Sequence, residues 1–286
     1  METYSLDSTK GNPGLFAIKR MEQLYEDAQG KADHPHRHAY YTVIWAIEGS
    51  GSHRIDFKTY PLSGNAVFFV SPGQVHQLIA TSRPKGYVIT FSKEFLQQNH
   101  ISEDFINEIN LFNNFENRPP IFLDSKTANL LQQLVDNMAE VAHAVPQHQI
   151  AAQSAYLKLF FIYCEASCNK SELETETPSR GKYILREFKK LIEAEFKTLH
   201  KVSDYADRMH LTPRYLNQVV KSILGHTAKE LIQEKLILNA KRELWYSEKS
   251  VKEIAIELGF DDPLYFSSFF KNCTGLAPSE FRESGR

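Results

Sequence analysis

Hydrophobic residues follow one pattern in the first third of the chain and a different one afterwards. From Tyr41 to Phe91, short runs rich in Val, Ile, Phe, Tyr and Trp are separated by the turn signals EGSGS, Pro61, SGN, SPG and RPKG. Runs of this length and composition, bounded by Gly, Pro, Asn and Ser, are typical of strands. Their regular spacing predicts a small antiparallel barrel or sandwich, without alternating strand and helix units.

Helical spacing follows the strands. Between Asp124 and His143 apolar residues recur every three or four positions, and the segment from Ala155 to Ala166 is mostly apolar. Both patterns predict helices. Such helices either cover the barrel or form a dimer interface, and the sequence leaves these two roles open.

A polar, acidic segment then interrupts the hydrophobic pattern. This segment, NKSELETETPSRG at residues 169–181, ends in Pro178 and Gly181 and has the composition of a linker. We therefore predict a barrel domain at residues 1–168, a linker at 169–181 and an all-α domain at 182–286. The expected fold class is α+β.

The predicted all-α domain contains an internal repeat. Residues 202–231 align with residues 251–281, at an offset of 49 before a turn and 50 after it, so the second turn is one residue longer. The matching positions are Ala206 and Ala255, His210 and Gly259, Leu216 and Phe266, Val220 and Phe270, Lys221 and Lys271, Gly225 and Gly275, and Glu230 and Glu280.

Each repeat has the features of a helix-turn-helix. A small residue, Ala206 or Ala255, stands where a second helix must cross closely. Four residues later the chain must leave the first helix with a positive φ, which Gly259 does without steric cost and which His210 tolerates better than most residues.

The second helix of each unit has a clear start signal. Thr212 can accept a hydrogen bond as N-cap, with Pro213 at the first helical position, and Asp262 with Pro263 repeats the arrangement. We therefore predict two capped second helices, which in such motifs enter the major groove of DNA.

The second helix of the first unit has an apolar and a polar face. The face that we expect to be buried consists of Leu216, Val219, Val220 and Ile223. The opposite face consists of Arg214, Asn217, Gln218 and Lys221, spaced at i, i+3, i+4 and i+7. Arg pairs bidentately with guanine, and Asn or Gln with adenine. The same pattern alone would describe a solvated helix face, and the repeat is what favours DNA reading.

The second unit carries no bidentate base reader at the matching positions. We therefore expect the first unit to supply most hydrogen-bonded base readout, and the second to contact thymine methyl groups and phosphates. The residues expected to contact DNA are Thr212, Arg214, Tyr215, Asn217, Gln218, Lys221, Leu264, Tyr265, Ser267, Ser268 and Lys271.

Residues 227–247, between the two units, predict one long amphipathic helix. A helix of about 18 residues is roughly 27 Å long. Such a spacer helps to hold two reading helices near the roughly 34 Å repeat of one turn of DNA.

Composition and charge support this division. At 286 residues the chain is long enough for two domains. Residues 180–286 carry 19 basic and 15 acidic residues, whereas residues 1–179 carry 14 and 20, so the C-terminal part has the basic balance. The chain has no run of 18 apolar residues and no secretory signal at its start, which predicts a soluble, cytoplasmic protein without membrane contact. The three cysteines are expected to be reduced packing residues.

The C-terminal pattern resembles the DNA-binding domain of the AraC/XylS family of bacterial regulators. The resemblance covers residues 183–286 and rests on LTPRYL and on KEIAIELGFDDPLYFSSFFKNCTGLAPSEFR. One departure is His210, where many helix-turn-helix units have glycine. The resemblance implies a transcription regulator that is not an enzyme, with an N-terminal domain that senses a small molecule and dimerises.

The N-terminal segments HPHRH and SPGQVH resemble the two short motifs of a cupin barrel. Metal-binding cupins supply two histidines, a carboxylate and a third histidine, but here Thr42 stands at the carboxylate position. We therefore expect no metal or other cofactor, although three histidines can still hold Zn²⁺ or Fe²⁺. The residues expected at an effector site in the barrel mouth are His36, His38, Tyr40, Tyr41, Trp45 and His76.

The expected partners are a double-stranded DNA operator, an unknown small-molecule effector, RNA polymerase and a second copy of the chain. Two rival functions stay open. One is a metal-dependent cupin enzyme fused to a DNA-binding module, and the other is a constitutive DNA-binding dimer without an effector. Activation and repression are equally compatible with the sequence.

Overall fold

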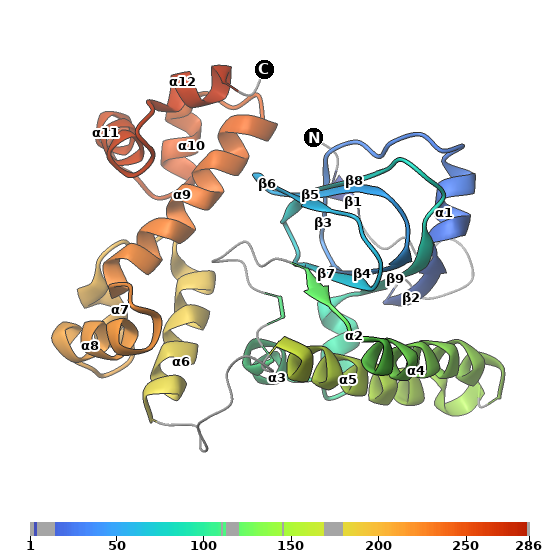
Figure 1. Cartoon of the computed structure of the whole chain (residues 1–286). Coiled ribbons are helices and arrows are strands. Elements are labelled where there is room, and N and C mark those ends of the chain that lie inside the picture. Colours follow the sequence, from blue (N-terminus) through green and yellow to red (C-terminus); the bar gives the residue numbers. More distant parts are fainter. Residues whose placement is uncertain are drawn as a thin grey trace. The chain divides into compact units, whose positions relative to one another are not determined.

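The computed structural model describes residues 3–4, 15–109, 111–112, 120–144, 146–168 and 180–284. The chain divides into two compact units, residues 1–174 and residues 175–286 (Figure 1). The predicted linker, residues 169–181, lies outside the described residues except for its last two, which already belong to a helix.

The N-terminal unit contains two five-stranded sheets, as the strand pattern predicts. The first sheet has the order β1 (Thr3–Tyr4), β3 (His36–His38), β8 (Val75–Ala80), β5 (Gly51–Ile55), β6 (Lys58–Pro61). The second has the order β10 (Ile121–Phe122), β7 (Ala66–Val70), β4 (Tyr41–Glu48), β9 (Lys85–Phe91), β2 (Phe16–Arg20). Neighbouring strands are antiparallel, except for the parallel pair β1 and β3.

Strand β4 contributes to two hydrophobic cores, because successive side chains on a strand point to opposite faces. Ile44 and Ala46 join residues of both sheets in one core. Val43 and Trp45 join residues of the helices in the other core. All of positions 42–46 are buried, so this strand shows no alternation of polar and apolar residues.

Two long helices, α4 (Ser125–Ala144) and α5 (Gln149–Cys168), lie side by side and bury Leu131, Met138 and Phe160 in the helix-facing core (Figure 1). The sequence predicts both, although α5 begins six residues earlier than expected. The unit also contains α1 (Met21–Asp27), α2 (Lys93–Gln98), α3 (Glu103–Glu108) and the 3₁₀ helix η1 (Pro146–His148), which the pattern does not predict.

The C-terminal unit is all helical in its described part. It contains α6 (Arg180–Glu195), α7 (Val202–Arg208), α8 (Pro213–Leu224), α9 (Ala228–Tyr246), α10 (Val251–Glu257), α11 (Pro263–Thr274) and α12 (Pro278–Glu283). Helices α7 and α10 start 49 residues apart, and α8 and α11 start 50 apart, so the repeat seen in the sequence is a structural repeat.

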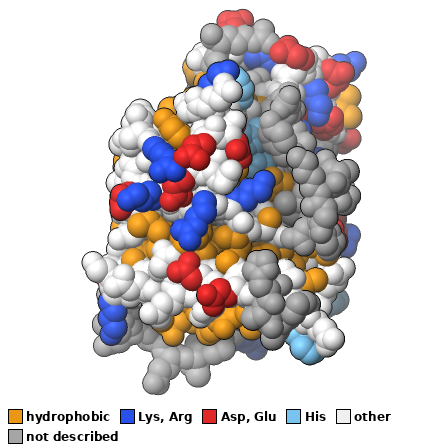
Figure 2. All heavy atoms as spheres, turned by 90° about the vertical axis from the view of Figure 1, so that its right-hand side faces the viewer, with side chains coloured by type: hydrophobic (Ala, Val, Ile, Leu, Met, Phe, Trp, Pro, Cys, Tyr) orange, Lys and Arg blue, Asp and Glu red, His pale blue; other side chains and the backbone are white. Residues whose placement is uncertain are grey.

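Two further observations concern the surface and the length of the helices. Figure 2 shows one face of the molecule, on which basic and acidic side chains are mixed and hydrophobic side chains form a band. Among the described residues, no helix is both long enough and apolar enough to cross a membrane.

Candidate DNA-binding surface and barrel site

The turns of both helix-turn-helix units have the backbone geometry that the sequence predicts. His210 has a φ of 55° and Gly259 a φ of 80°, so both lie in the left-handed region. Gly259 has a second constraint, because a Cβ there would lie 1.7 Å from the carbonyl oxygen of Lys197. His210 is exposed, so its side chain can extend into solvent.

The predicted N-caps are also present. The Thr212 hydroxyl accepts a hydrogen bond from the backbone N–H of Tyr215 at 3.2 Å. The Asp262 carboxylate accepts one from the backbone N–H of Leu264 at 2.8 Å. Each cap fixes where the second helix begins, and therefore which side chains its first turn presents.

Helix α8 has the two faces that were predicted, with one exception. Leu216, Val219 and Val220 are buried, whereas Ile223 is 38% exposed and does not belong to the core. Ile223 lies in the last turn of the helix, beyond the reach of the crossing helices. On the opposite side Arg214, Tyr215, Gln218 and Lys221 are exposed, as base or phosphate contact requires.

Asn217 differs from its neighbours on the polar face. Its side-chain carbonyl accepts a hydrogen bond from the backbone N–H of Ala228 at 3.0 Å, at the start of α9. Bidentate pairing with adenine uses both polar atoms of the amide. Asn217 would therefore have to break this bond in order to read a base, and its evident role is to join α8 to α9.

Helix α11 presents apolar side chains to solvent where α8 presents polar ones. Leu264 is 77% exposed and Tyr265 is 65% exposed, and Ser268 and Lys271 are exposed as well. Ser267 is half-buried, and its hydroxyl donates to the carbonyl oxygen of Pro263. Exposed large apolar side chains are costly in water, so their place at this position favours contact with a partner surface.

Helix α9 is the long connecting helix that was predicted, but it is not amphipathic. Its 19 residues are about 28 Å long at about 1.5 Å per residue. Buried side chains surround it, because α6, α7 and α8 pack against it as well as α10, α11 and α12. Even Lys235 is 2% exposed, and its ammonium group pairs with Glu193.

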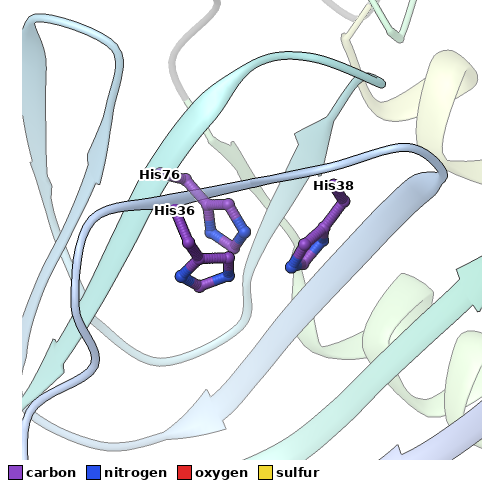
Figure 3. A group of neighbouring side chains, drawn as sticks. All are labelled: His36, His38 and His76. Atoms are coloured by element: carbon purple, nitrogen blue, oxygen red, sulfur yellow. The ribbon is translucent and has the colours of Figure 1, made fainter. Parts of the chain in front are cut away.

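In the N-terminal unit the structure brings three predicted histidines together. His36 and His38 come from β3 and His76 from β8, and their side chains point toward one another (Figure 3). One ring nitrogen of each lies within 4.8 Å of the others, and all three residues are buried. Tyr40 stacks on His38 with the ring centroids 4.4 Å apart.

Two other residues predicted at the effector site lie elsewhere. Tyr41 stacks on Phe91, and Trp45 contacts Tyr87 and Phe160 of α5, so both belong to the helix-facing core. The reason is the strand period: odd positions of β4 face the helices, and even positions such as Thr42 face the histidines. The expectation that Tyr41 and Trp45 line the barrel is therefore wrong.

One member of the histidine cluster was missed. His53 on β5 is fully buried, and its Nε2 shares a hydrogen bond of 3.0 Å with Nδ1 of His76. It belongs to no recognisable motif, but it alternates with Ile55, which is also buried. That alternation within GSHRI is the signal that could have placed His53 inside the barrel.

Burial keeps the rings of His38, His53 and His76 neutral. It lowers the pKa of His38 and of His53 to about 3, and the nearby charge of His36 contributes less. Burial also lowers the pKa of His76 well below its usual value, followed by the effects of His53, His38 and His36. Neutral imidazoles offer a lone pair, and the cluster is therefore suited to bind a hydrogen-bond donor or a cation.

Two family models match the chain. The model of the AraC-like ligand binding domain matches residues 21–160, which include the whole histidine cluster. The model of a helix-turn-helix domain matches residues 205–284, which include the second unit and the first unit from Tyr205 onward.

The chain is also similar to transcription regulators over most of its length. The chain is 24% identical over 251 residues to the HTH-type transcriptional activator RhaS of Mannheimia succiniciproducens, covering 86% of this chain and 88% of that protein. It is 22% identical to the HTH-type transcriptional activator RhaR of Escherichia coli K12, covering 88% and 86%. It is 24% identical to the HTH-type transcriptional regulator YfiF of Bacillus subtilis, covering 86% and 78%. The chain belongs to the AraC family and is a DNA-binding transcription regulator with an N-terminal ligand-binding domain.

Proposed function

We propose that a small molecule bound at the histidine cluster changes the affinity of the C-terminal unit for its operator. The observation that carries this proposal is the buried cluster itself, in which Nε2 of His76 is enclosed without a hydrogen-bond partner in the described part of the chain. An unpaired buried polar atom costs about 1–3 kcal/mol, so a ligand that pairs with it gains binding energy.

The experiment first selects DNA duplexes that the protein binds from a pool of random sequences. The selected sequence then serves as the operator. A screen of small molecules by thermal shift then finds compounds that bind the folded protein. We expect a stabilising compound to change operator affinity by a factor of about 5–150 at fixed salt. A change of the same size in a His76→Phe variant would contradict binding at the cluster, and stabilising compounds without any effect on operator affinity would contradict the regulatory role.

The proposal includes a homodimer formed through α5. One face of this helix is buried in the core, but the other also carries apolar side chains, which are exposed: Ala151, Ala155, Leu159, Ile162 and Ala166. Their spacing of four, four, three and four residues is that of a helix-packing stripe. A second copy of the same stripe is a suitable cover, because both surfaces are apolar and uncharged.

We expect Leu159→Glu together with Ile162→Glu to convert a dimer into a monomer, because each change would place a carboxylate in a desolvated interface. Sedimentation or light scattering of the full chain measures this directly. Phe122→Glu is the control, since Phe122 is 56% exposed on β10 and lies outside the stripe. A dimer that survives the double change, or a monomeric unchanged protein, would rule out this interface.

Two of the relatives carry the name of transcriptional activators. This supports the further proposal that the DNA-bound protein acts on RNA polymerase to raise transcription. The exposed surface of the C-terminal unit outside α8 and α11 is available for such contact, because the reading helices occupy the DNA.

A further inference from the structure

The three clustered histidines share a feature of their hydrogen bonding. In each ring, Nδ1 is engaged by a group outside this set of three. Nδ1 of His36 lies 2.8 Å from the carbonyl oxygen of His34 and 3.2 Å from a carboxylate oxygen of Asp33. Because both neighbours are acceptors, Nδ1 of His36 carries a proton, and in the neutral ring Nε2 then presents a lone pair.

In the other two rings, too, Nδ1 is the nitrogen that is hydrogen-bonded. Nδ1 of His38 shares a hydrogen bond of 2.8 Å with the Thr42 hydroxyl. Nδ1 of His76 shares one of 3.0 Å with Nε2 of His53. Metal-binding histidines nearly always use the second ring nitrogen in this way, which fixes the orientation of the ring.

Nε2 of His76 is the atom that most needs a partner. It is buried without a hydrogen bond among the described residues, in a side chain that Figure 3 shows directed at His36 and His38. Asp33, Thr42 and His53 therefore act as outer supports of a set of three inward nitrogen donors.

We propose that Nε2 of His36, His38 and His76 binds a divalent transition-metal ion, and that His53 is a positioning residue for His76. Imidazole donors suit zinc, iron, nickel and copper, whereas calcium and magnesium need oxygen ligands. Three protein nitrogens are the ligand set of an open zinc site, whose fourth position takes water or an oxygen donor. The inference goes beyond the proposed function and does not depend on it, because an ion can bind here whether or not it alters DNA affinity.

The geometry needs only a small adjustment. A tetrahedral zinc ion with bonds of about 2.0–2.1 Å holds its nitrogens about 3.3 Å apart. One ring nitrogen of each of the three histidines already lies within 4.8 Å of the others. Closing the longest separation by about 1.5 Å is within the reach of side-chain rotation on β3 and β8, which are neighbouring strands with His36 and His76 in register.

Thr42 explains why the set has three donors. Its hydroxyl is hydrogen-bonded to Nδ1 of His38, so Thr42 supports one of the donors and is not a donor itself. The ion would therefore keep an exchangeable position, which a ligand of the regulator could occupy.

The test uses the full chain without a histidine tag, stripped with a chelator and dialysed against Zn²⁺ or Co²⁺. We expect one ion per chain, together with the intense visible absorption of tetrahedral cobalt. The single changes His36→Gln, His38→Gln and His76→Gln should each weaken binding at least 100-fold. His148→Gln is the matched control, because His148 is an exposed histidine of the same unit.

Thermal unfolding of each metal-free variant checks that it folds. If one of the three variants does not fold, the remaining two decide the outcome. Failure of the unchanged protein to take up either ion would overturn the inference, as would undiminished binding in the folded variants.

The role of His53 has its own readout. His53→Leu removes the partner of His76, whereas His53→Gln keeps a polar group at that place. We expect the leucine variant to lose metal affinity by about 10–100-fold and the glutamine variant to recover much of it. Equal metal affinities in the His53→Leu and His53→Gln variants would contradict the positioning role of His53.

These measurements distinguish a failure of the metal-binding proposal from a failure of the regulatory proposal. Uptake is measured without DNA, and operator affinity is then compared between the metal-free and the metal-loaded protein. Uptake without a change in operator affinity supports the ion site and leaves the regulatory proposal to the thermal-shift screen.

Discussion

Replacing Gly259 by alanine should unfold the C-terminal unit under conditions in which the N-terminal unit stays folded. The added Cβ would lie 1.7 Å from the Lys197 carbonyl oxygen, which is backbone and cannot rotate away. The φ of 80° adds a second cost for any L side chain. Together we expect a loss of about 3 kcal/mol or more, a large part of the stability of such a domain.

The two tryptophans make this measurable in the full chain. Trp45 is buried in the N-terminal unit, and Trp245 lies in α9, with its ring 5.4 Å from that of Phe281. In a Trp45→Phe background, fluorescence during denaturation follows the C-terminal unit alone. In a Trp245→Phe background it follows the other unit, whose transition should not move.

His210→Gly is the matched control at the equivalent turn of the first unit. It relieves a positive φ on a side-chain-bearing residue but gives the unfolded chain more freedom. We expect these effects to leave a net change below about 1 kcal/mol. If the Gly259→Ala protein were as stable as its parent, the Lys197 carbonyl oxygen would not exclude a side chain at this position.

The second large effect concerns base reading. Replacing both Arg214 and Gln218 by alanine should remove about 2–6 kcal/mol of discrimination between the operator and unrelated duplexes, since each bidentate pair contributes about 1–3 kcal/mol. Both side chains are exposed on α8. Competition binding at fixed salt, followed by reselection from a random pool, gives the loss at each base position.

Leu264→Ala together with Ser268→Ala is the comparison on α11. We expect it to relax sequence preference less, because methyl and phosphate contacts carry less base information. The opposite ranking of the two double variants would refute the division of labour between the helices. Asn217 is left unchanged in this comparison, because its side chain holds the first turn of α9 and its loss would act on folding.

Local chemistry explains which parts of the fold could be predicted. The repeat, the caps at Thr212 and Asp262 and the turns at His210 and Gly259 depend on residues close in sequence, and the structure has all five features. Each cap needs a side-chain hydrogen-bond acceptor and each turn needs a positive φ, and few residue types meet either requirement.

Tertiary packing explains the errors. Positions 42–46 are buried on both faces of β4, so the sequence could not show that Trp45 faces the helices and Thr42 the histidines. Packing also explains the error at α9. Its sequence suggests an amphipathic helix, but helices of both units pack against it, so it has no single buried face. His53 escaped notice because a single histidine in a strand carries no motif.

The packing of both helix-turn-helix units on α9 has a consequence for the choice of operator. Because one helix joins them, the angle between α8 and α11 about the DNA axis is set by the protein and not by the duplex. Each base pair inserted between the two contacted segments rotates them relative to one another by about 34–36°. If both α8 and α11 read the operator, the regulator would therefore measure helical phase as well as sequence, and a site with correct bases at the wrong phase would be held by one unit only.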